Sequence, residues 1–142
     1  MEIKEAKKED LQGIYDLYLE VMGYDYPLEK MNKMLKVINA SNCNYLFIAS
    51  DNLKVIGVIE VVIKYSIHKD PYLIINTLAV LSNYQGKGVG GQLLDYVEKF
   101  AKKNQLSSIT LGSQFKRKTA HQFYLNHGFK IIKDHKIFEK RL

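Results

Sequence analysis

Residues 82–91 read SNYQGKGVGG, and this stretch says more about the fold than any other part of the sequence. It joins an Ile- and Leu-rich run, Tyr72–Leu81, to a segment whose apolar residues recur at helical spacing from Val89 to Ala101. Four of the nine glycines fall within residues 86–91. Because glycine in the first turn of a helix costs about 1 kcal/mol relative to alanine, this cluster indicates a backbone that a ligand approaches closely.

The charges around this turn favour an anionic ligand. A helix N-terminus presents free N–H groups and a partial positive charge, which together bind phosphate. No Asp or Glu follows in the helix until Asp95, whereas Lys87 adds a cation within the turn. The stretch therefore predicts a phosphate-binding turn between a strand and a helix.

Two familiar phosphate motifs do not explain the turn. Residues 86–91 satisfy G-x-G-x-x-G literally, but they follow the fourth expected strand, and the next strand ends at residues 111–114 without the required acid. The nucleoside-triphosphate loop needs Ser or Thr after its lysine, and Lys87 is followed by Gly88. The chain is also too short to build a dinucleotide-binding domain that begins at Gly86.

Periodicity and turn residues predict the remaining elements. Strands are expected at Ile3–Ala6, Tyr45–Ala49, Val55–Tyr65, Tyr72–Leu81, Ser108–Leu111, Phe129–Ile132 and Lys136–Phe138. Helices are expected from about Glu9, from Leu28 to Ile38, from Val89 and from Arg117 to Asn126. Turns are expected at Asp51-Asn52 and at His68–Pro71. The element order is β-α-α-β-β-β-α-β-α-β-β, which predicts one mixed sheet with helices on both faces.

Length and composition exclude several classes of protein. With 142 residues, 46% of them hydrophobic, and only 2 prolines, the chain is a folded domain and not a disordered or fibrous one. A single cysteine, Cys43, indicates a reducing, cytoplasmic setting. No export signal and no membrane-spanning segment is expected. The net charge of +6 comes from dispersed residues, nearly all lysines, so a dedicated nucleic-acid face is not expected.

Two motifs carry a resemblance to a known family. Residues 85–90, QGKGVG, fit the pattern Q/R-x-x-G-x-G/A, and Thr77–Val80 precedes them as a strand segment. Residues 120–129, AHQFYLNHGF, fit A-x-x-F-Y-x-x-x-G-F. The two motifs occur in the order and at the distance that are found in the GNAT superfamily of N-acetyltransferases, which this sequence resembles specifically from about Tyr72 to Phe129.

The resemblance implies a fold and an activity. The fold is a single α/β (α+β) domain over residues 1–142, with a mixed, mostly antiparallel sheet of about seven strands flanked by four helices. The activity is direct transfer of an acetyl group from acetyl-CoA to an amine of a small molecule, peptide or protein, without a metal. Residues that match the family's CoA contacts are Leu78, Ala79, Val80, Gln85, Gly86, Lys87, Gly88, Val89, Gly90, Arg117 and Ala120. The resemblance is also compatible with a homodimer.

The same resemblance assigns the proton donor but leaves the general base open. Tyr124 matches the tyrosine that protonates the departing CoA thiolate, a reasonable role for a phenol of pKa about 10. Many relatives carry a carboxylate on the fourth strand, where this chain has Ile74 and Asn76. Either Glu60, set among Val and Ile on the third strand, accepts the proton, or a water near Asn76 does.

Other readings remain at this point. The missing carboxylate is compatible with a domain that binds acyl-CoA without turnover, and the positive charge with a nucleic-acid binder. Arg117 stands where the family often has Asn, so Lys116 and Arg117 are expected to attract CoA phosphates instead of making the amide contact. Residues 24–26, YDY, lie in the loop that in the family borders the acceptor site, and they are expected to influence substrate choice.

Overall fold

The computed structural model describes all residues, 1–142, as two compact units, Met1–Gly112 and Ser113–Leu142. The helices are α1 (Leu11–Met22), α2 (Leu28–Ala40), α3 (Val89–Lys103) and α4 (Lys118–Asn126). The strands are β1 (Glu2–Glu5), β2 (Asn44–Asp51), β3 (Lys54–Ser66), β4 (Lys69–Val80) and β5 (Ile109–Leu111). Short 3₁₀ turns at Lys8–Asp10 and Ser82–Tyr84 precede α1 and the glycine-rich loop. The first unit holds the whole sheet, and the second holds α4.

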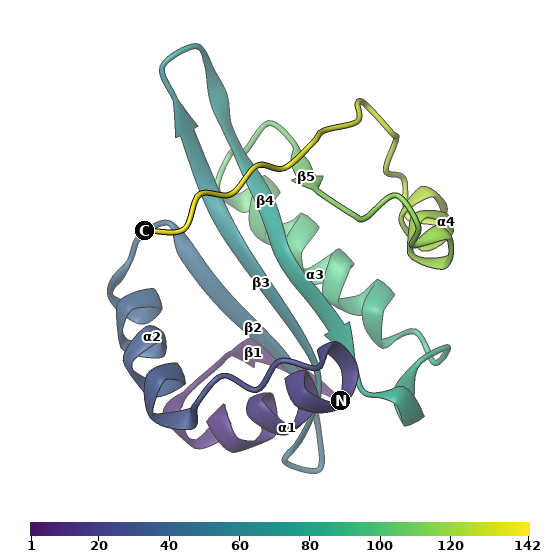
Figure 1. Ribbon diagram of the computed structural model, residues 1–142. Helices are drawn as coiled ribbons and strands as arrows, with labels where there is room; N and C mark the ends of the chain where they lie inside the picture. The colour runs from purple at the N-terminus through teal and green to yellow at the C-terminus, as the bar shows by residue number, and fades with distance from the viewer. The chain divides into compact units, whose positions relative to one another are not determined.

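The sheet has the strand order β1-β2-β3-β4-β5 (Figure 1). The pairs from β1 to β4 are antiparallel, and β5 runs parallel to β4. The predicted mixed, mostly antiparallel sheet and the four helices are thus confirmed. The β5 ladder covers only Leu73–Ile75 of β4, so the rest of that β4 edge has no strand beside it.

Helices of the first unit cover both faces of the sheet, because alternate side chains of a strand point to opposite faces. Phe47 of β2 packs edge-to-face against Tyr96 and Phe100 of α3, with ring centroids 5.0 and 5.4 Å apart. Figure 1 shows α3 behind the sheet. The neighbouring Leu46 points to the opposite face and lines a cavity with residues of α1 and α2. None of the helices is long and apolar enough to span a bilayer.

A glycine allows α3 to lie close to the sheet. A Cβ at Gly57 of β3 would be 2.9 Å from Leu93 Cδ1 and 3.1 Å from Val89 Cγ1, both on α3. These distances are shorter than ordinary van der Waals contacts, so any residue other than glycine would require the Leu93 and Val89 side chains to shift. Val89 is the first residue of α3. The close contact at Gly57 therefore sets the distance between the sheet and the start of the helix, where the glycine-rich loop ends.

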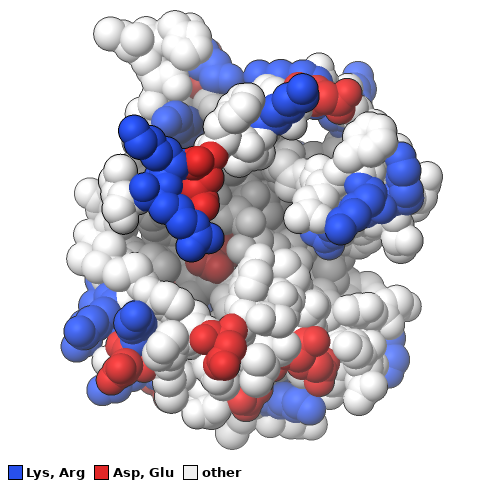
Figure 2. Space-filling model, in the orientation of Figure 1, with Lys and Arg blue, Asp and Glu red and all other residues white.

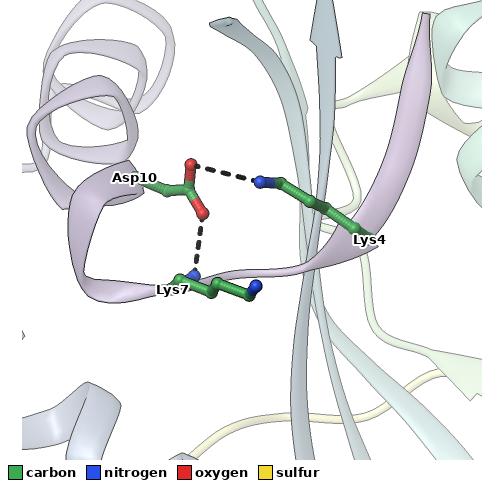
Figure 3. A network of polar contacts seen from close by, with 3 residues as sticks. All are labelled: Lys4, Lys7 and Asp10. Atoms are coloured by element: carbon green, nitrogen blue, oxygen red, sulfur yellow. Dashed lines mark hydrogen bonds and ion pairs between the residues drawn. The ribbon is translucent and has the colours of Figure 1, made fainter.

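A small polar network joins β1 to the start of α1 (Figure 3). Asp10 accepts a hydrogen bond of 2.8 Å from the backbone N–H of Lys7, and its other oxygen lies 3.9 Å from Lys4 Nζ. A carboxylate at a helix N-terminus also interacts favourably with the helix dipole. The network fixes the direction in which α1 leaves β1.

Two expectations about strands are wrong. The segments Phe129–Ile132 and Lys136–Phe138 are not strands, so the sheet has five strands instead of about seven. Their apolar side chains are largely exposed: Ile131 and Ile132 by 72%, Ile137 by 87% and Phe138 by 90%. Alternating apolar residues give a strand its pattern, but the strand forms only with a hydrogen-bonded partner, and an isolated hairpin is marginal in water.

The predicted turn at His68–Pro71 is also misplaced. β4 begins at Lys69, and the hairpin turns at residues 67–68. Pro71 lies where the register of β3 and β4 shifts, between the pairs Lys64–Tyr72 and Ser66–Lys69. Such an irregularity accommodates a residue that cannot donate to the ladder, which is why proline did not end the strand.

Candidate functional site

The glycine-rich loop reverses the chain between β4 and α3 with a backbone that other residues rarely adopt. Gly86 has φ +75° and Gly88 has φ +86°, both in the left-handed region. A Cβ at Gly86 would meet nothing within 4 Å, so the loop is open on that side. Val89 is buried and anchors the loop to the sheet. The backbone of the loop is thus accessible to a ligand, and the buried Val89 side chain attaches the loop to the sheet.

The first turn of α3 leaves its amides free. Gln92 donates its backbone N–H to Gly88 O at 3.0 Å, so the amides before it, at residues 89–91, lie outside the helical ladder. No side chain caps the helix, and no acidic residue stands in the first turn. Lys87 Nζ lies 5.6 Å from the centroid of the Tyr84 ring. These donors and this cation fit a phosphate group.

The predicted ligand contact Gln85 has a structural use. Its Nε2 donates to the backbone oxygen of Val80 at 2.9 Å, and its own N–H donates to Ser82 O at 3.3 Å. The side chain therefore ties the loop to the end of β4. This bond fixes where the amides of the loop lie relative to the strand.

The edge of β4 that β5 leaves free carries backbone groups without a strand partner, and one of them, the Val80 oxygen, accepts the Gln85 side chain. The Leu81 N–H donates to Ile56 O next to β3 at 2.9 Å. Because successive residues of a strand direct their backbone groups to opposite sides, Leu78 and Val80 direct theirs away from β3, and Ala79 directs its own toward it. The predicted residues Leu78 and Val80 are thus placed to pair with an extended ligand.

Glu60 is opposite Thr77 on β4 and faces α1. The Tyr18 hydroxyl of α1 donates a hydrogen bond to the Glu60 carboxylate. Burial, the negative charge of Glu60 and this hydrogen bond raise the pKa of Tyr18 well above 10, and the Thr77 hydroxyl opposes the shift. Tyr18 therefore remains a neutral donor at physiological pH.

Sequence reasoning named Glu60 but missed Tyr18. Tyr18 falls on the apolar stripe of α1, and its hydroxyl was the only sign that it does more than pack. Thr77 was noted only as part of the motif strand. The pairing register and the contact with α1 reveal their roles, and neither follows from spacing along the sequence.

Asn76 is the extra residue of an irregularity in β4. Glu60 pairs with Thr77 and Val61 with Ile75, which leaves Asn76 without a partner on β3. It is exposed, next to the point where the β5 ladder stops. The structure therefore places Thr77, and not Asn76, opposite Glu60.

Glu60 opens into a cavity of about 640 Å³ on the α1–α2 face of the sheet. Its walls come from α1, residues 23–26, α2, β2 and β3. The lining residues are Leu11, Ile14, Tyr15, Tyr18, Gly23, Tyr24, Asp25, Tyr26, Met31, Met34, Leu35, Ile38, Leu46 and Glu60. This volume lies in the range of small-molecule sites. No group of three or more His, Cys, Asp or Glu side chains could hold a metal ion.

In the second unit, local contacts explain the spacing of the motif at residues 120–129. Gly128 has φ +88°, which turns the chain after α4 so that the Phe129 N–H donates to Tyr124 O at 3.1 Å. The Phe129 ring then packs edge-to-face on the Tyr124 ring, at 5.8 Å between centroids. Phe123 packs on the same ring at 5.5 Å. The spacing of Tyr, Gly and Phe thus holds the Tyr124 ring between two aromatic neighbours.

Tyr124 is protonated at neutral pH. Burial raises the pKa of its phenol above 10, and the nearby Arg117 charge lowers it to a smaller extent. Arg117 precedes α4, and Ala120 lies in its first turn, where there is no acid. His121 lies 2.9 Å from Gln114 O through Nε2 and so fixes the segment before the helix. The neutral phenol of Tyr124 is suited to proton donation. The first turn of α4, which has no acidic residue, is suited to binding an anion.

Comparison with known proteins decides the family. The sequence model of the Acetyltransferase (GNAT) family matches residues 11–129. The chain belongs to the GNAT family of acetyltransferases. An aminoalkylphosphonate N-acetyltransferase of Salmonella typhimurium is 29% identical over 132 residues, covering 91% of this chain and 84% of its own. An uncharacterised N-acetyltransferase of Bacillus subtilis is 36% identical over 127 residues, covering 89% of each chain.

Solved structures agree on the fold. An aminoglycoside 6'-N-acetyltransferase from Acinetobacter haemolyticus superposes with a TM-score of 0.83 at 18% identity, over 100% of this chain and 99% of its own. An aminoglycoside N-acetyltransferase in complex with CoA superposes with a TM-score of 0.86 at 18% identity, over 99% and 95%. The family resemblance drawn from the two motifs is confirmed. The protein is an acetyl-CoA-dependent N-acetyltransferase.

Proposed function

We propose that this GNAT enzyme acetylates the primary amine of a small molecule that enters the cavity on the α1–α2 face, with Glu60 as the proton acceptor. The observation that carries the proposal is that Glu60 opens into this cavity and is paired on β4 with Thr77, next to the free edge. The Tyr18 hydrogen bond holds the carboxylate in place. A carboxylate that is oriented by a neutral donor and open to a substrate cavity is suited to general-base catalysis.

Acetyl-CoA fits the free edge and the glycine-rich loop. The pantetheine arm would pair with the backbone of Leu78–Val80, whose outward groups have no strand partner. The pyrophosphate would accept hydrogen bonds from the amides of Gly86–Gly90 and from those that begin α3, with Lys87 beside it. Arg117 and Ala120 stay predicted contacts, on the strength of the second motif. An outward N–H on β4 would polarise the thioester carbonyl.

The reaction forms one C–N bond and breaks one C–S bond. The ammonium substrate first loses a proton through Glu60, directly or through water, because only the neutral amine attacks the carbonyl carbon. The tetrahedral intermediate then expels the CoA thiolate, and the nitrogen loses a second proton. Tyr124 supplies the proton that the thiolate takes up and regains one afterwards. The products are the amide, CoA thiol and one proton released to solvent.

The relatives support an amine of small-molecule size. The Salmonella typhimurium enzyme bears the name of an aminoalkylphosphonate acetyltransferase, and several structural neighbours are aminoglycoside acetyltransferases. Both are small molecules with an amino group. The volume of the cavity, about 640 Å³, suits an acceptor of that size better than a folded protein surface.

Replacement of Glu60 tests the base. The variant Glu60→Gln retains an oxygen that can accept the Tyr18 hydrogen bond but cannot take up a proton, and it should lower kcat about a hundredfold or more. The assay measures release of CoA thiol across a panel of amines. Glu29→Gln, on the exposed surface of α2, is the matched control. A wild-type rate in Glu60→Gln would remove Glu60 from the role of base.

Replacement of Tyr124 tests the acid. Tyr124→Phe keeps the ring between Phe123 and Phe129 but removes the proton that the thiolate receives. We expect kcat to fall about tenfold or more while CoA affinity, measured by calorimetry, changes little. Tyr65→Phe, on a largely exposed ring of β3, is the control. An unchanged kcat would exclude Tyr124 as the acid.

A further inference from the structure

The cavity contains two tyrosine–carboxylate pairs. Tyr15 donates to Asp25 in the loop between α1 and α2, and Tyr18 donates to Glu60 on β3. The two tyrosines are three residues apart on α1 and so lie on one face of the helix. The hydrogen bond to Asp25, more than any other cause, raises the pKa of Tyr15, so this hydroxyl stays a donor. One carboxylate is thus held by the loop and the other by the sheet.

Two carboxylates line the cavity, and its lining has no cation. Among the fourteen residues of the lining, the charged ones are Asp25 and Glu60. Lys30 is outside the lining, and its Nζ lies 5.9 Å from the centroid of the Tyr26 ring. Figure 2 shows acidic side chains gathered over α1 in the lower part of the view. An ammonium group is favoured in such a cavity, and an anionic group is repelled.

Aromatic residues flank Asp25. Tyr24 and Tyr26 on either side of it are 49% and 48% exposed, so both rings are partly accessible to a ligand. Tyr24 packs edge-to-face on Tyr18 at 5.7 Å, which holds it in place. The contact of Lys30 with Tyr26 shows that this ring can receive an ammonium group. Asp25 uses one oxygen for Tyr15, and its remaining lone pairs are available to a second donor.

Much of the remaining lining is aliphatic. Met31, Met34, Leu35 and Ile38 of α2 provide it, together with Leu11 and Leu46. Methionine side chains adapt to unbranched chains of different length. A ligand that meets both carboxylates and this aliphatic lining therefore needs two cationic groups joined by a hydrocarbon segment.

We propose that the acceptor is an aliphatic di- or polyamine, with one amine at Glu60 for acetylation and a second ammonium held by Asp25 and the rings of Tyr24 and Tyr26. This assignment rests on the proposed function of the cavity as the acceptor site. It separates this chain from its Salmonella typhimurium relative, because a phosphonate would face Asp25 in place of an ammonium. The Tyr15–Asp25 pair is then the element that selects a doubly charged amine over a singly charged one.

The test compares three amines of matched length: an α,ω-diaminoalkane, the n-alkylamine and the ω-aminoalkylphosphonate. In the wild-type enzyme we expect the diamine to have the lowest KM and the phosphonate the highest. Asp25→Asn should raise the KM of the diamine about tenfold or more, since it removes the negative charge that pairs with the second ammonium but keeps an oxygen that can accept from Tyr15, and should leave that of the n-alkylamine unchanged. Asp70→Asn, on an exposed residue near the hairpin end, is the control with the same change of charge.

Calorimetry in the presence of CoA measures binding of the same amines without turnover. The diamine should bind the wild-type protein tightly and Asp25→Asn weakly, by the same factor as the change in KM. Diamine binding that depends on Asp25 but leads to no thiol release with any amine would overturn the proposed function and would leave only the diamine-binding site at Asp25 standing. Equal diamine affinity in wild type and Asp25→Asn, or tighter binding of the phosphonate, would overturn the inference.

Discussion

Tyr18 connects the helical layer to the carboxylate that we assign as the base, and its titration gives a prediction about stability. Its pKa in the folded protein is raised above the value of 10 that it has in the unfolded chain. Above pH 10 the unfolded chain therefore releases this proton first, and stability falls as pH rises. The loss for this one group is at most about 1.4 kcal/mol per pH unit, and below pH 10 there is none.

The variant Tyr18→Phe lacks this group and should lose less stability than the wild type above pH 10. At neutral pH it should be about 1 kcal/mol less stable, because the hydrogen bond to Glu60 is gone. Urea unfolding at pH 7, 10 and 11 measures both effects, with Tyr65→Phe as the variant of an exposed ring. Parallel curves for wild type and Tyr18→Phe across pH 10–11 would contradict the assignment.

Single residues also show what the sequence can and cannot predict of a site. Gly86, Gly88 and Gln85 are recognisable because a phosphate turn needs particular residue types at fixed spacing, and the structure places them in one loop. Tyr18 and Asp25 carry no such spacing. Their partners, Glu60 and Tyr15, are 42 and 10 residues away along the chain, so only the folded arrangement reveals the pairs.

At the level of elements, we propose that β4 and α3 together form the surface that receives acetyl-CoA, and hydrogen exchange can test this. The amides of Leu78 and Val80 point to the free edge, whereas the Leu81 amide is bonded to Ile56 O at 2.9 Å. We expect the first two amides to exchange fast without CoA and to become protected with it. The Leu81 amide should be protected in both states. Protection of Leu78 and Val80 without CoA would show that another partner covers the edge.

The contact between α3 and β3 predicts a loss of stability. Gly57→Ala would place a Cβ 2.9 Å from Leu93 Cδ1, and overpacking of this kind costs about 1–3 kcal/mol. The shift of α3 should also weaken CoA binding, because Val89 begins the helix at the phosphate loop. Urea unfolding and calorimetry measure the two effects. Gly112→Ala, whose Cβ would meet nothing within 4 Å, should change neither, and a stable Gly57→Ala would refute the close contact.

Helices and strands could be predicted from the sequence where the apolar pattern of a segment is matched by a surface or a strand that it packs against. Val89, Leu93, Leu94, Val97 and Ala101 recur at helical spacing, and all are buried against the sheet. The segments 129–132 and 136–138 show the apolar pattern of strands but have no ladder, because pairing depends on an edge elsewhere in the chain. Pro71 is the opposite case. It predicts a turn, but it lies within β4, because the pairing of β3 and β4 is irregular there.

For the whole molecule, the excess of six positive charges gives less information than the two motifs. The net charge is compatible with any anionic ligand. The glycine-rich loop, the free edge of β4 and the start of α3 instead fit an extended ligand that carries a phosphate group. Over the face shown in Figure 2, lysines and arginines form several separate groups with acidic residues between them. A ligand whose binding depends on its shape should therefore be distinguishable from one whose binding depends only on its charge.

Thermal unfolding with each kind of ligand makes this distinction. A ligand that binds only the folded state stabilises it by about 2.7 kcal/mol at one hundred times its Kd, which corresponds to roughly 10 °C in Tm for a chain of this size. We expect such a shift with CoA, and expect most of it to persist in about 0.2 M salt, because backbone amides carry much of the binding. A short DNA duplex should give a shift that disappears at that salt concentration, since phosphate contacts by dispersed lysines are screened. A DNA shift that persists in salt and in saturating CoA would point to a second, nucleic-acid surface that the dispersed charges do not suggest.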